Sequence, residues 1–272
     1  MPEGPEIRRA ADVVADALVG EVITTVRFGL PALRRESKRL RNHRVIDVET
    51  RGKAMLTHFD HGWSIYSHNQ LYGVWRVCAG SKLPHSKRSL RLLLQTRDHS
   101  AILYSASDIS VWRSEELHEH PFLARLGPDI MDKKLAWRDI ASRLQSSRFS
   151  GRRLASLYLD QGFLAGIGNY LRTEILFDAG LHPLRRAADL GVGERGRLAR
   201  STLSISHRSY QTGGITLRPA LMRALQKAGS PYQMRRFAAF GRAGQPCYRC
   251  GTPVAREEIG SRRIYWCKTC QA

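Results

Sequence analysis

The sequence LDQGFLAGIGNYLRTEIL, at residues 159–176, predicts a helix, a glycine-punctuated turn and a second helix. Gly166 and Gly168 allow the backbone to come close to a ligand, because glycine has no Cβ atom. Asn169 stands where an N-cap belongs, and the N-terminus of a helix attracts anions. An ordinary helix–loop–helix with glycines for packing is the alternative. Because the chain is strongly basic, we favour a turn that clamps phosphate.

Upstream of this turn the chain reads mostly as short strands. They are rich in β-branched or alternating apolar residues and cover residues 22–28, 43–50, 54–59, 63–67, 74–77, 90–95 and 101–105. Many short strands separated by polar or glycine-containing turns predict a β-sandwich or barrel. In front of them, an N-terminal helix is predicted from the apolar stripe of Ile7, Ala11, Val14 and Leu18.

The character of the chain changes around Gly127–Asp129, and from residue 137 to 203 apolar residues recur with helical spacing. We therefore predict an α+β multidomain protein. Its parts are an N-terminal β-sandwich domain at 1–126, a linker at 127–135, a helical domain at 136–239 and a cysteine-rich segment at 240–272. The last segment is too short to hold a core without a metal.

Four cysteines in this segment have the spacing of metal-binding knuckles, Cys247-x2-Cys250-x16-Cys267-x2-Cys270. Two Cys-x-x-Cys pairs predict one tetrahedral, all-cysteine zinc site. Four thiolates leave no open position, so the zinc would be structural rather than catalytic. The residues between the pairs suit a β-hairpin finger whose arginines, among them Arg262 and Arg263, reach phosphate.

The composition indicates a polyanionic partner. The 272 residues include 44 lysines and arginines against 24 acidic residues, a net charge of +20, which favours nucleic acid. Binding to a membrane surface is disfavoured, because acidic residues share the N-terminal helix. The sequence has no run of 18 apolar residues and no signal-peptide pattern.

Cysteine usage indicates a reducing compartment, and hence the cytoplasm, because four of the five cysteines form the metal motif. The fifth, Cys78, is a weak candidate for a catalytic thiol. It lies in an apolar strand without an evident partner, so a buried structural cysteine is the better interpretation.

The first six residues, Met-Pro-Glu-Gly-Pro-Glu, carry a candidate nucleophile. Removal of Met1 would leave Pro2 with a free secondary amine, partly unprotonated near neutral pH. Attack of this amine on a sugar C1′ would give an iminium, with Glu3 or Glu6 near enough in sequence to act as acid or base. The alternative is that these residues merely start a helix.

Together these features resemble the bacterial Fpg/Nei DNA glycosylases, and within them the endonuclease VIII branch. The resemblance runs in order along the whole chain and rests on residues 2–6, 51–54, 165–170 and the finger containing 265–267. Residues 66–76 and 103–109 favour endonuclease VIII over the formamidopyrimidine branch. The segment from Tyr210 to Phe237 departs from the endonuclease VIII pattern, which leaves the preferred base least defined.

The resemblance implies a helix-two-turn-helix DNA-binding domain and a set of catalytic residues. Pro2 would attack C1′ of the damaged nucleotide, and Glu3 would be the neighbouring general acid or base. Lys53 would contact phosphate and assist proton transfer in β-elimination, with a solvated surface lysine as the alternative. Arg262 would bind phosphate beside the lesion and serve δ-elimination, with Arg263 as a competing assignment.

The resemblance also implies DNA contacts. Gln70, Leu71 and Tyr72 would fill the gap left when the damaged base leaves the stack, although a buried strand is the alternative. Arg125 and Asn169 would contact DNA, and an exposed arginine without a role is nearly as good an interpretation of Arg125.

The activity implied is that of a bifunctional DNA glycosylase and AP lyase of base excision repair. It would excise oxidised pyrimidines such as thymine glycol and dihydrouracil from duplex DNA and cut the strand by β,δ-elimination. One structural Zn²⁺, a monomer and the bacterial cytoplasm, on the nucleoid, complete the expectation. The alternatives are a formamidopyrimidine/8-oxoguanine DNA glycosylase and a non-catalytic zinc-finger DNA-binding protein.

Overall fold

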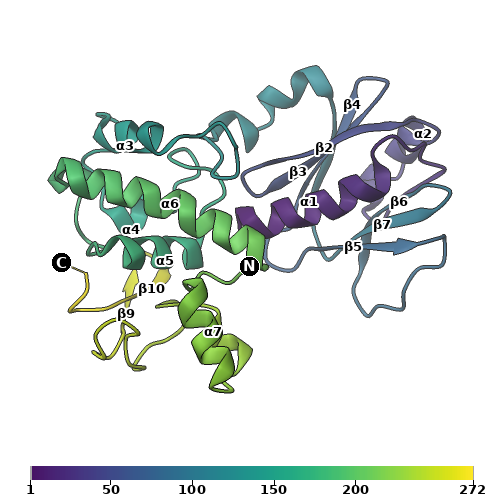
Figure 1. The fold of residues 1–272 in the computed structure, drawn as a ribbon. Coiled ribbons are helices and arrows are strands. Elements are labelled where there is room, and N and C mark those ends of the chain that lie inside the picture. Colours follow the sequence, from purple (N-terminus) through teal and green to yellow (C-terminus); the bar gives the residue numbers. More distant parts are fainter. Residues whose placement is uncertain (1, 272) are drawn as a thin grey trace. The chain divides into compact units, whose positions relative to one another are not determined.

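The chain forms two compact units in the computed structural model, which describes residues 2–271 (Figure 1). The first unit comprises Pro2 and Glu6–Arg125, and the second comprises Glu3–Pro5 together with residues 126–271. The stretch Glu3–Pro5 therefore packs with a part of the chain that is remote in sequence. No helix among the described residues combines the length and the apolar character that a membrane span requires.

Two four-stranded antiparallel sheets build the first unit, together with most of helix α1 (Gly4–Leu18). One sheet has the order β1 (Thr25–Phe28), β6 (Leu90–Gln95), β7 (His99–Tyr104), β5 (Val74–Ala79). The other has the order β2 (Val45–Arg51), β3 (Ala54–Phe59), β4 (Trp63–His68), β8 (Asp108–Arg113). Short helical segments fill the connections: η1 (Pro31–Leu33), α2 (Glu36–Leu40), η2 (Ser114–Glu119) and η3 (Leu123–Arg125). The predicted N-terminal helix and β-sandwich are confirmed.

The apolar stripe of α1 lies in the core of the first unit. Ile7, Ala11, Val14 and Leu18 are at most 2 % exposed. Full burial of a side chain such as Ile, Val or Leu stabilises the fold by roughly 1.5–3 kcal/mol. The stripe belongs to one cluster with inward-facing residues of both sheets, among them Phe28, Val48, Met55, Phe59, Leu92 and Leu103. The helix therefore shares one apolar core with both sheets.

Strand β8 was not predicted from the sequence. Its residues, DISVWR, alternate polar and apolar side chains, but Asp108 is a poor strand former and follows another turn-like stretch. Antiparallel pairing with β4, in the register Ile65 opposite Val111, supplies the stabilisation that the local sequence lacks. The strand depends on a partner some 40 residues earlier in the chain, which local patterns do not report.

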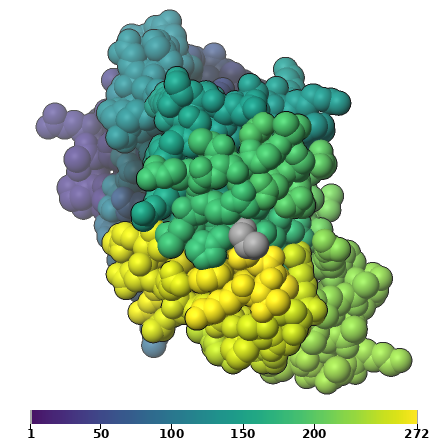
Figure 2. Space-filling model, turned by 90° about the vertical axis from the view of Figure 1, so that its left-hand side faces the viewer, coloured from purple at the N-terminus to yellow at the C-terminus, as the bar shows by residue number. Residues whose placement is uncertain are grey.

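The second unit is helical and ends in a hairpin. Its elements are α3 (Trp137–Gln145), α4 (Leu154–Leu157), α5 (Asn169–Ala179), η4 (Ala187–Asp189), α6 (Val192–Thr212), α7 (Pro219–Lys227), η5 (Tyr232–Arg235), β9 (Ala255–Ile259) and β10 (Arg262–Trp266). Every residue of α5 from Tyr170 to Phe177 is buried, and the helix stops at Gly180 in the left-handed conformation. The C-terminal residues, yellow in Figure 2, form a continuous surface with the green helices of this unit. The predicted helical domain is confirmed.

A buried carboxylate on α5 organises the chain that leads into the hairpin. Glu174 is 1 % exposed. Its oxygens accept hydrogen bonds from the backbone N–H groups of Ala238 (2.8 Å), Ala239 (2.8 Å) and Phe240 (2.9 Å). The hydroxyl of Thr216 donates a fourth bond at 2.6 Å. A buried charge is tolerated when it is paired in this way, so Glu174 fixes two otherwise irregular segments.

Replacing Glu174 with alanine is expected to destabilise the protein strongly. The change leaves three N–H groups without an acceptor, that of the buried Ala239 and those of the partly buried Ala238 and Phe240, at about 1–3 kcal/mol each. We therefore expect a loss of at least about 3 kcal/mol in urea unfolding. Glu174→Gln keeps one acceptor oxygen and should lose less.

Glu258→Ala is the matched control, because Glu258 is exposed on β9, and its effect should stay within about 0.5 kcal/mol. Equal stability of the Glu174→Ala and Glu258→Ala variants would contradict this account of the buried carboxylate.

Candidate active site

The N-terminus of α5 is occupied by the carboxylate of Glu3, which is 3 % exposed. Oε2 of Glu3 accepts hydrogen bonds from the N–H groups of Gly168 (2.7 Å) and Leu171 (3.2 Å). Oε1 accepts one from the N–H of Tyr170 at 2.9 Å. The predicted anion site therefore exists, but the chain itself supplies the anion. The prediction that Asn169 is the N-cap is wrong, because Gly168 holds that position.

Glycines let the N-terminal segment come this close. A Cβ atom on Gly168 would lie 2.4 Å from Oε1 of Glu3, so only glycine fits there. Gly4 donates its N–H to the carbonyl of Gly166 at 2.8 Å, and Gly166 has a φ of +100°, which favours glycine. The close approach that the sequence predicted for a ligand is thus made by residues 3 and 4, directly after the half-buried Pro2.

Arg172, in the first turn of α5, is fully buried and joins the helix to the C-terminal hairpin. Its guanidinium donates to the side-chain oxygen of Asn169 (2.5 Å) and to the carbonyl of Arg263 (3.0 Å). A further bond reaches the carbonyl of Ala155 at 3.0 Å. Asn169 also donates its amide to the carbonyl of Arg263 at 2.9 Å. Asn169 therefore holds the hairpin backbone, a role that its sequence position did not reveal.

The charge of Arg172 belongs to the electrostatics of this site. Burial lowers the pKa of Arg172 to about 10, the Glu3 carboxylate raises it, and Arg262 lowers it again. The guanidinium therefore stays protonated at neutral pH and offsets the charge of Glu3. Sequence reasoning missed Arg172. The signal that could have revealed it is an arginine within a helix whose other residues are too apolar for the helix to be exposed.

The two finger arginines point to opposite faces of β10. Successive strand residues alternate in direction, so Arg262 shares a face with the buried Ile264, and Arg263 shares one with Tyr265. Both arginines are exposed. The charge of Arg262 lowers the pKa of the buried Arg172 in the first turn of α5, after the larger effect of burial.

Lys53 lies in the turn between β2 and β3, within the first unit. With Gly52, which has a φ of +63°, it makes the two-residue connection between Arg51 and Ala54. Burial lowers the pKa of His68, at the end of β4; Asp108 opposes this shift and the Lys53 ammonium adds to it. Lys53 therefore lies close to the chain that leads out of β4, rather than on an isolated surface.

The turn between β4 and β5 presents two apolar side chains to solvent. Leu71 is 55 % exposed and Tyr72 is 71 % exposed, so the alternative of a buried strand is wrong. Gln70 has a positive φ of 51°; its N–H donates to Nδ1 of His68 at 3.0 Å. Its side-chain oxygen accepts a bond from Ser107 at 2.8 Å. An ordered turn thus displays an apolar wedge beside an amide.

Arg125 ends the first unit and is exposed. Its Nε donates to the carbonyl of Pro121 at 2.7 Å, which leaves the other guanidinium nitrogens for a ligand. The predicted site residues thus fall into two groups. Glu3, Asn169 and Arg262 lie in the second unit, and Lys53, Arg125 and residues 70–72 lie in the first.

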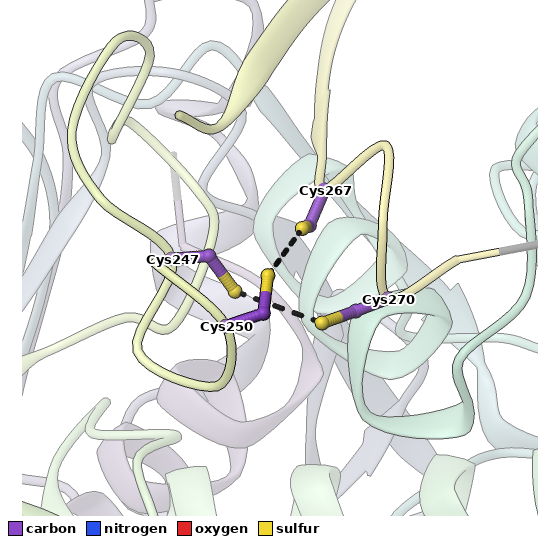
Figure 3. A group of neighbouring side chains, drawn as sticks. All are labelled: Cys247, Cys250, Cys267 and Cys270. Atoms are coloured by element: carbon purple, nitrogen blue, oxygen red, sulfur yellow. Dashed lines mark hydrogen bonds between the residues drawn. The ribbon is translucent and has the colours of Figure 1, made fainter. Parts of the chain in front are cut away.

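The four cysteines of the C-terminal segment converge on one point (Figure 3). All four Sγ atoms lie within 4.8 Å of one another. The Cys250–Cys267 and Cys247–Cys270 separations are 3.4 and 3.9 Å. Tetrahedral zinc with Zn–S bonds of about 2.3 Å needs sulfur atoms about 3.8 Å apart. The cluster could therefore hold a metal ion, as its spacing predicted.

Comparison with known proteins gives matches along the whole chain. Residues 1–107 match the formamidopyrimidine-DNA glycosylase N-terminal domain, and residues 126–220 match the formamidopyrimidine-DNA glycosylase H2TH domain. Endonuclease 8 of Shigella sonnei is 47 % identical over 271 residues, and that of Klebsiella pneumoniae is 46 % identical. Each match covers 100 % of both chains.

Solved structures with the same fold include DNA complexes. A complex of Lactococcus lactis Fpg (MutM) with N7-benzyl-Fapy-dG-containing DNA superposes with a TM-score of 0.82 at 21 % identity, covering 99 % of each chain. A complex of the same protein with abasic-site DNA gives 0.82 at 20 % identity, again covering 99 % of each chain. These likenesses show the fold, which agrees with the predicted architecture.

The hydrogen bond between His68 and Gln70 is expected to break in acid, because Nδ1 of His68 accepts only when unprotonated. The pKa of His68 is lowered in the folded protein, so this stabilisation is fully present above the ordinary value of 6.5 and is lost as the pH falls through the lowered pKa. The bond contributes about 0.5–1.5 kcal/mol. Two-dimensional NMR should show the Gln70 amide resonance titrating in acid.

His68→Asn is the matched control, since an asparagine oxygen can accept the same N–H bond without titrating. A Gln70 amide that is insensitive to pH in the native protein, or that titrates equally in the variant, would show that His68 does not order the turn.

Proposed function

The chain belongs to the formamidopyrimidine-DNA glycosylase family, and from this membership we propose that it is a bifunctional DNA glycosylase and AP lyase. A role as a DNA glycosylase in DNA repair follows from the family itself. The observation that carries the finer proposal is the carboxylate of Glu3 seated on α5, because it fixes the chain immediately after Pro2. A nucleophile held on a buried anchor is preorganised for attack.

Pro2, freed of Met1, supplies the nucleophile. Its amine lone pair forms a bond to C1′ while the bond from C1′ to the base breaks, and the base leaves with that electron pair and takes up a proton from solvent. Opening of the sugar ring protonates O4′ and gives an iminium. Loss of a C2′ proton then expels the 3′ phosphate, and loss of the C4′ proton in a second elimination expels the 5′ phosphate. Covalent catalysis of this kind splits one difficult step into easier ones.

Glu3 is the proposed acid–base partner of Pro2. Three N–H donors hold its carboxylate, and hydrogen bonds to the charged form favour that form. Glu3 therefore begins the reaction as a base, able to accept the proton that the attacking amine releases. It can return this proton to O4′ during ring opening.

The DNA contacts are proposed from exposure and charge. Lys53 and Arg262 bind phosphates, with Arg125 as a further contact. Asn169 acts on DNA through the hairpin backbone that it holds. Leu71 and Tyr72, which are exposed, occupy the gap left by the extruded base together with Gln70. With a net charge of +20, affinity for duplex DNA falls steeply as salt rises.

Zinc is the proposed occupant of the four-cysteine cluster, with a structural role. Four thiolates and no open position fit that metal. Cys247 and Cys267 pack in one apolar cluster with Phe177 of α5, so a metal there would hold the hairpin to the helix. We also propose the division into 1–126, 127–135, 136–239 and 240–272, and a cytoplasmic monomer.

Oxidised pyrimidines, such as thymine glycol and dihydrouracil, are the proposed substrates, because the relatives of high identity are endonuclease 8 proteins. The second candidate is the formamidopyrimidine and 8-oxoguanine activity of the sister branch. It is kept because the segment 210–237, which contains α7, departs from the endonuclease VIII pattern.

Borohydride trapping should capture the native protein on a thymine-glycol duplex, because reduction turns the iminium into a stable amine. Mass spectrometry should place the cross-link on the terminal peptide at Pro2. Pro2→Gly should lose most of the cross-link and of strand cleavage, while binding to an uncleavable abasic analogue changes less than about threefold, because Pro2 supplies no phosphate contact.

Trapping on 8-oxoguanine but not on thymine glycol would move the protein to the sister branch. Tight binding with no adduct on either lesion, or on an abasic site, would reduce it to a DNA-binding protein.

Arg262→Ala should lower the yield of the δ-elimination product about 10–100-fold, the range for losing a hydrogen bond of about 1.5–3 kcal/mol to a charged group. Gel analysis of the 3′ ends separates the β from the β,δ product. Arg263→Ala is the matched control, because it removes an equal charge from the other face of the same strand. Equal losses in the two variants would point to general charge attraction instead.

A further inference from the structure

A second group of side chains that could hold a metal ion lies in the first unit, at the turn between β3 and β4. It consists of His43, just before β2, and Asp60 and His61 in the turn. Nδ1 of His43 is 3.1 Å from Oδ1 of Asp60, and Nδ1 of His61 is 3.6 Å from the same oxygen. The three ligand atoms lie within 4.8 Å of one another, close enough to share one ion.

The backbone holds Asp60 in place for this arrangement. Its other carboxylate oxygen, Oδ2, accepts the N–H of Arg44 at 3.2 Å, and its own N–H donates to the carbonyl of Arg44 at 3.0 Å. These bonds extend the β2–β3 ladder by one step beyond Val45 and Phe59. Oδ1 is left facing the two imidazoles, so one oxygen positions the side chain and the other is available as a ligand.

The two imidazoles are held face to face. The rings of His43 and His61 stack with centroids 3.6 Å apart and planes within 13°. Both ring nitrogens of His61 are buried; the backbone of Arg39 lies near the ring, but neither nitrogen makes a hydrogen bond of good geometry to a described residue. A buried polar nitrogen without a partner costs about 1–3 kcal/mol, and a ligand that pairs with it would recover this loss.

We propose that His43, Asp60 and His61 bind a divalent transition-metal ion, through Nδ1 of each histidine and Oδ1 of the aspartate. Metal–ligand bonds of about 2.0–2.1 Å in tetrahedral geometry put ligand atoms about 3.3 Å apart, between the two separations observed. Two imidazoles and one carboxylate suit zinc, nickel, cobalt or copper rather than magnesium or calcium, which prefer oxygen. Water completes the shell.

Coordination requires the rings to turn about their Cβ–Cγ bonds until the two nitrogen lone pairs converge. The side chain of His43 is 38 % exposed and that of His61 is 19 % exposed, so His43 has the greater room to turn toward Oδ1 of Asp60. Two arginines lie near the group and also make contacts outside it. Arg39 pairs with Glu36 and lies over the ring of Trp63 at 3.9 Å, and Arg44 donates to the carbonyl of Gly20.

The experiment is a titration of the full chain with Co²⁺ after its cysteine site has been filled with one equivalent of zinc. Cobalt on nitrogen and oxygen ligands gives weak visible bands, whereas cobalt on thiolates adds an intense charge-transfer band. We expect one further equivalent of Co²⁺, with the weak bands only. Calorimetry with Zn²⁺ should count the same second equivalent.

Asp60→Asn and His61→Gln should each lower the affinity for the second Co²⁺ by at least about tenfold. This is the lower end of the loss seen when a residue that only supports a metal ligand is removed. His85→Gln is the matched control, because His85 is an exposed histidine in the loop between β5 and β6. It should bind Co²⁺ as the native protein does. Zinc added beyond the first equivalent should also raise the melting temperature of the native chain above its value with the second site empty. The same addition should not raise the melting temperature of the Asp60→Asn variant.

The proposal is overturned if the native protein takes up no second equivalent, or if all three variants bind it equally. An intense charge-transfer band would assign the cobalt to the cysteines instead. Circular dichroism of each variant separates lost binding from lost folding. None of these measurements involves DNA or strand cleavage, so their outcome is independent of the proposed repair activity.

Discussion

The structure depends on one buried contact, between the carboxylate of Glu3 and the N–H groups that open α5. It satisfies helix donors that would otherwise need water or a ligand, and it places a negative charge where the helix dipole favours one. Because of it, Glu3–Pro5 packs with residues 126–271 while α1 continues into the first unit. Pro2, the candidate nucleophile, is therefore adjacent to a residue that is held firmly in place.

Helix α5 shows how a fully buried helix can carry charge. Arg172 and Glu174 are both at most 1 % exposed, yet each makes hydrogen bonds to backbone groups of other segments, Arg172 to the carbonyl of Arg263 and Glu174 to the N–H groups of residues 238–240. A buried charge that lacked these partners would be costly, whereas here it specifies where the loops lie. The same helix therefore supports the N-terminal segment, the 238–240 chain and the hairpin backbone at Arg263.

Local patterns in the sequence were sufficient for much of this protein. Alternation predicted the sandwich, and two Cys-x-x-Cys pairs predicted a cluster that the fold assembles. Contacts between residues far apart in the sequence could not be predicted. Gly166 and Gly168 indicated a close approach, but no nearby residue indicates that residues 3 and 4 make it. For the same reason Asn169 looked like a cap and Arg172 was overlooked, because their partner, the carbonyl of Arg263, lies more than 90 residues away.

The missing side chain at position 168 also constrains how this protein can evolve. A Cβ atom there would collide with the Glu3 carboxylate, so position 168 cannot gain a side chain while Glu3 keeps its place on the helix. A glutamate seated on this helix therefore requires glycine at position 168, although glycine at that position does not require the glutamate. A descendant with any other residue at position 168 must have moved the side-chain carboxylate of residue 3 off the helix. It would then need a different way to hold its N-terminal segment in place.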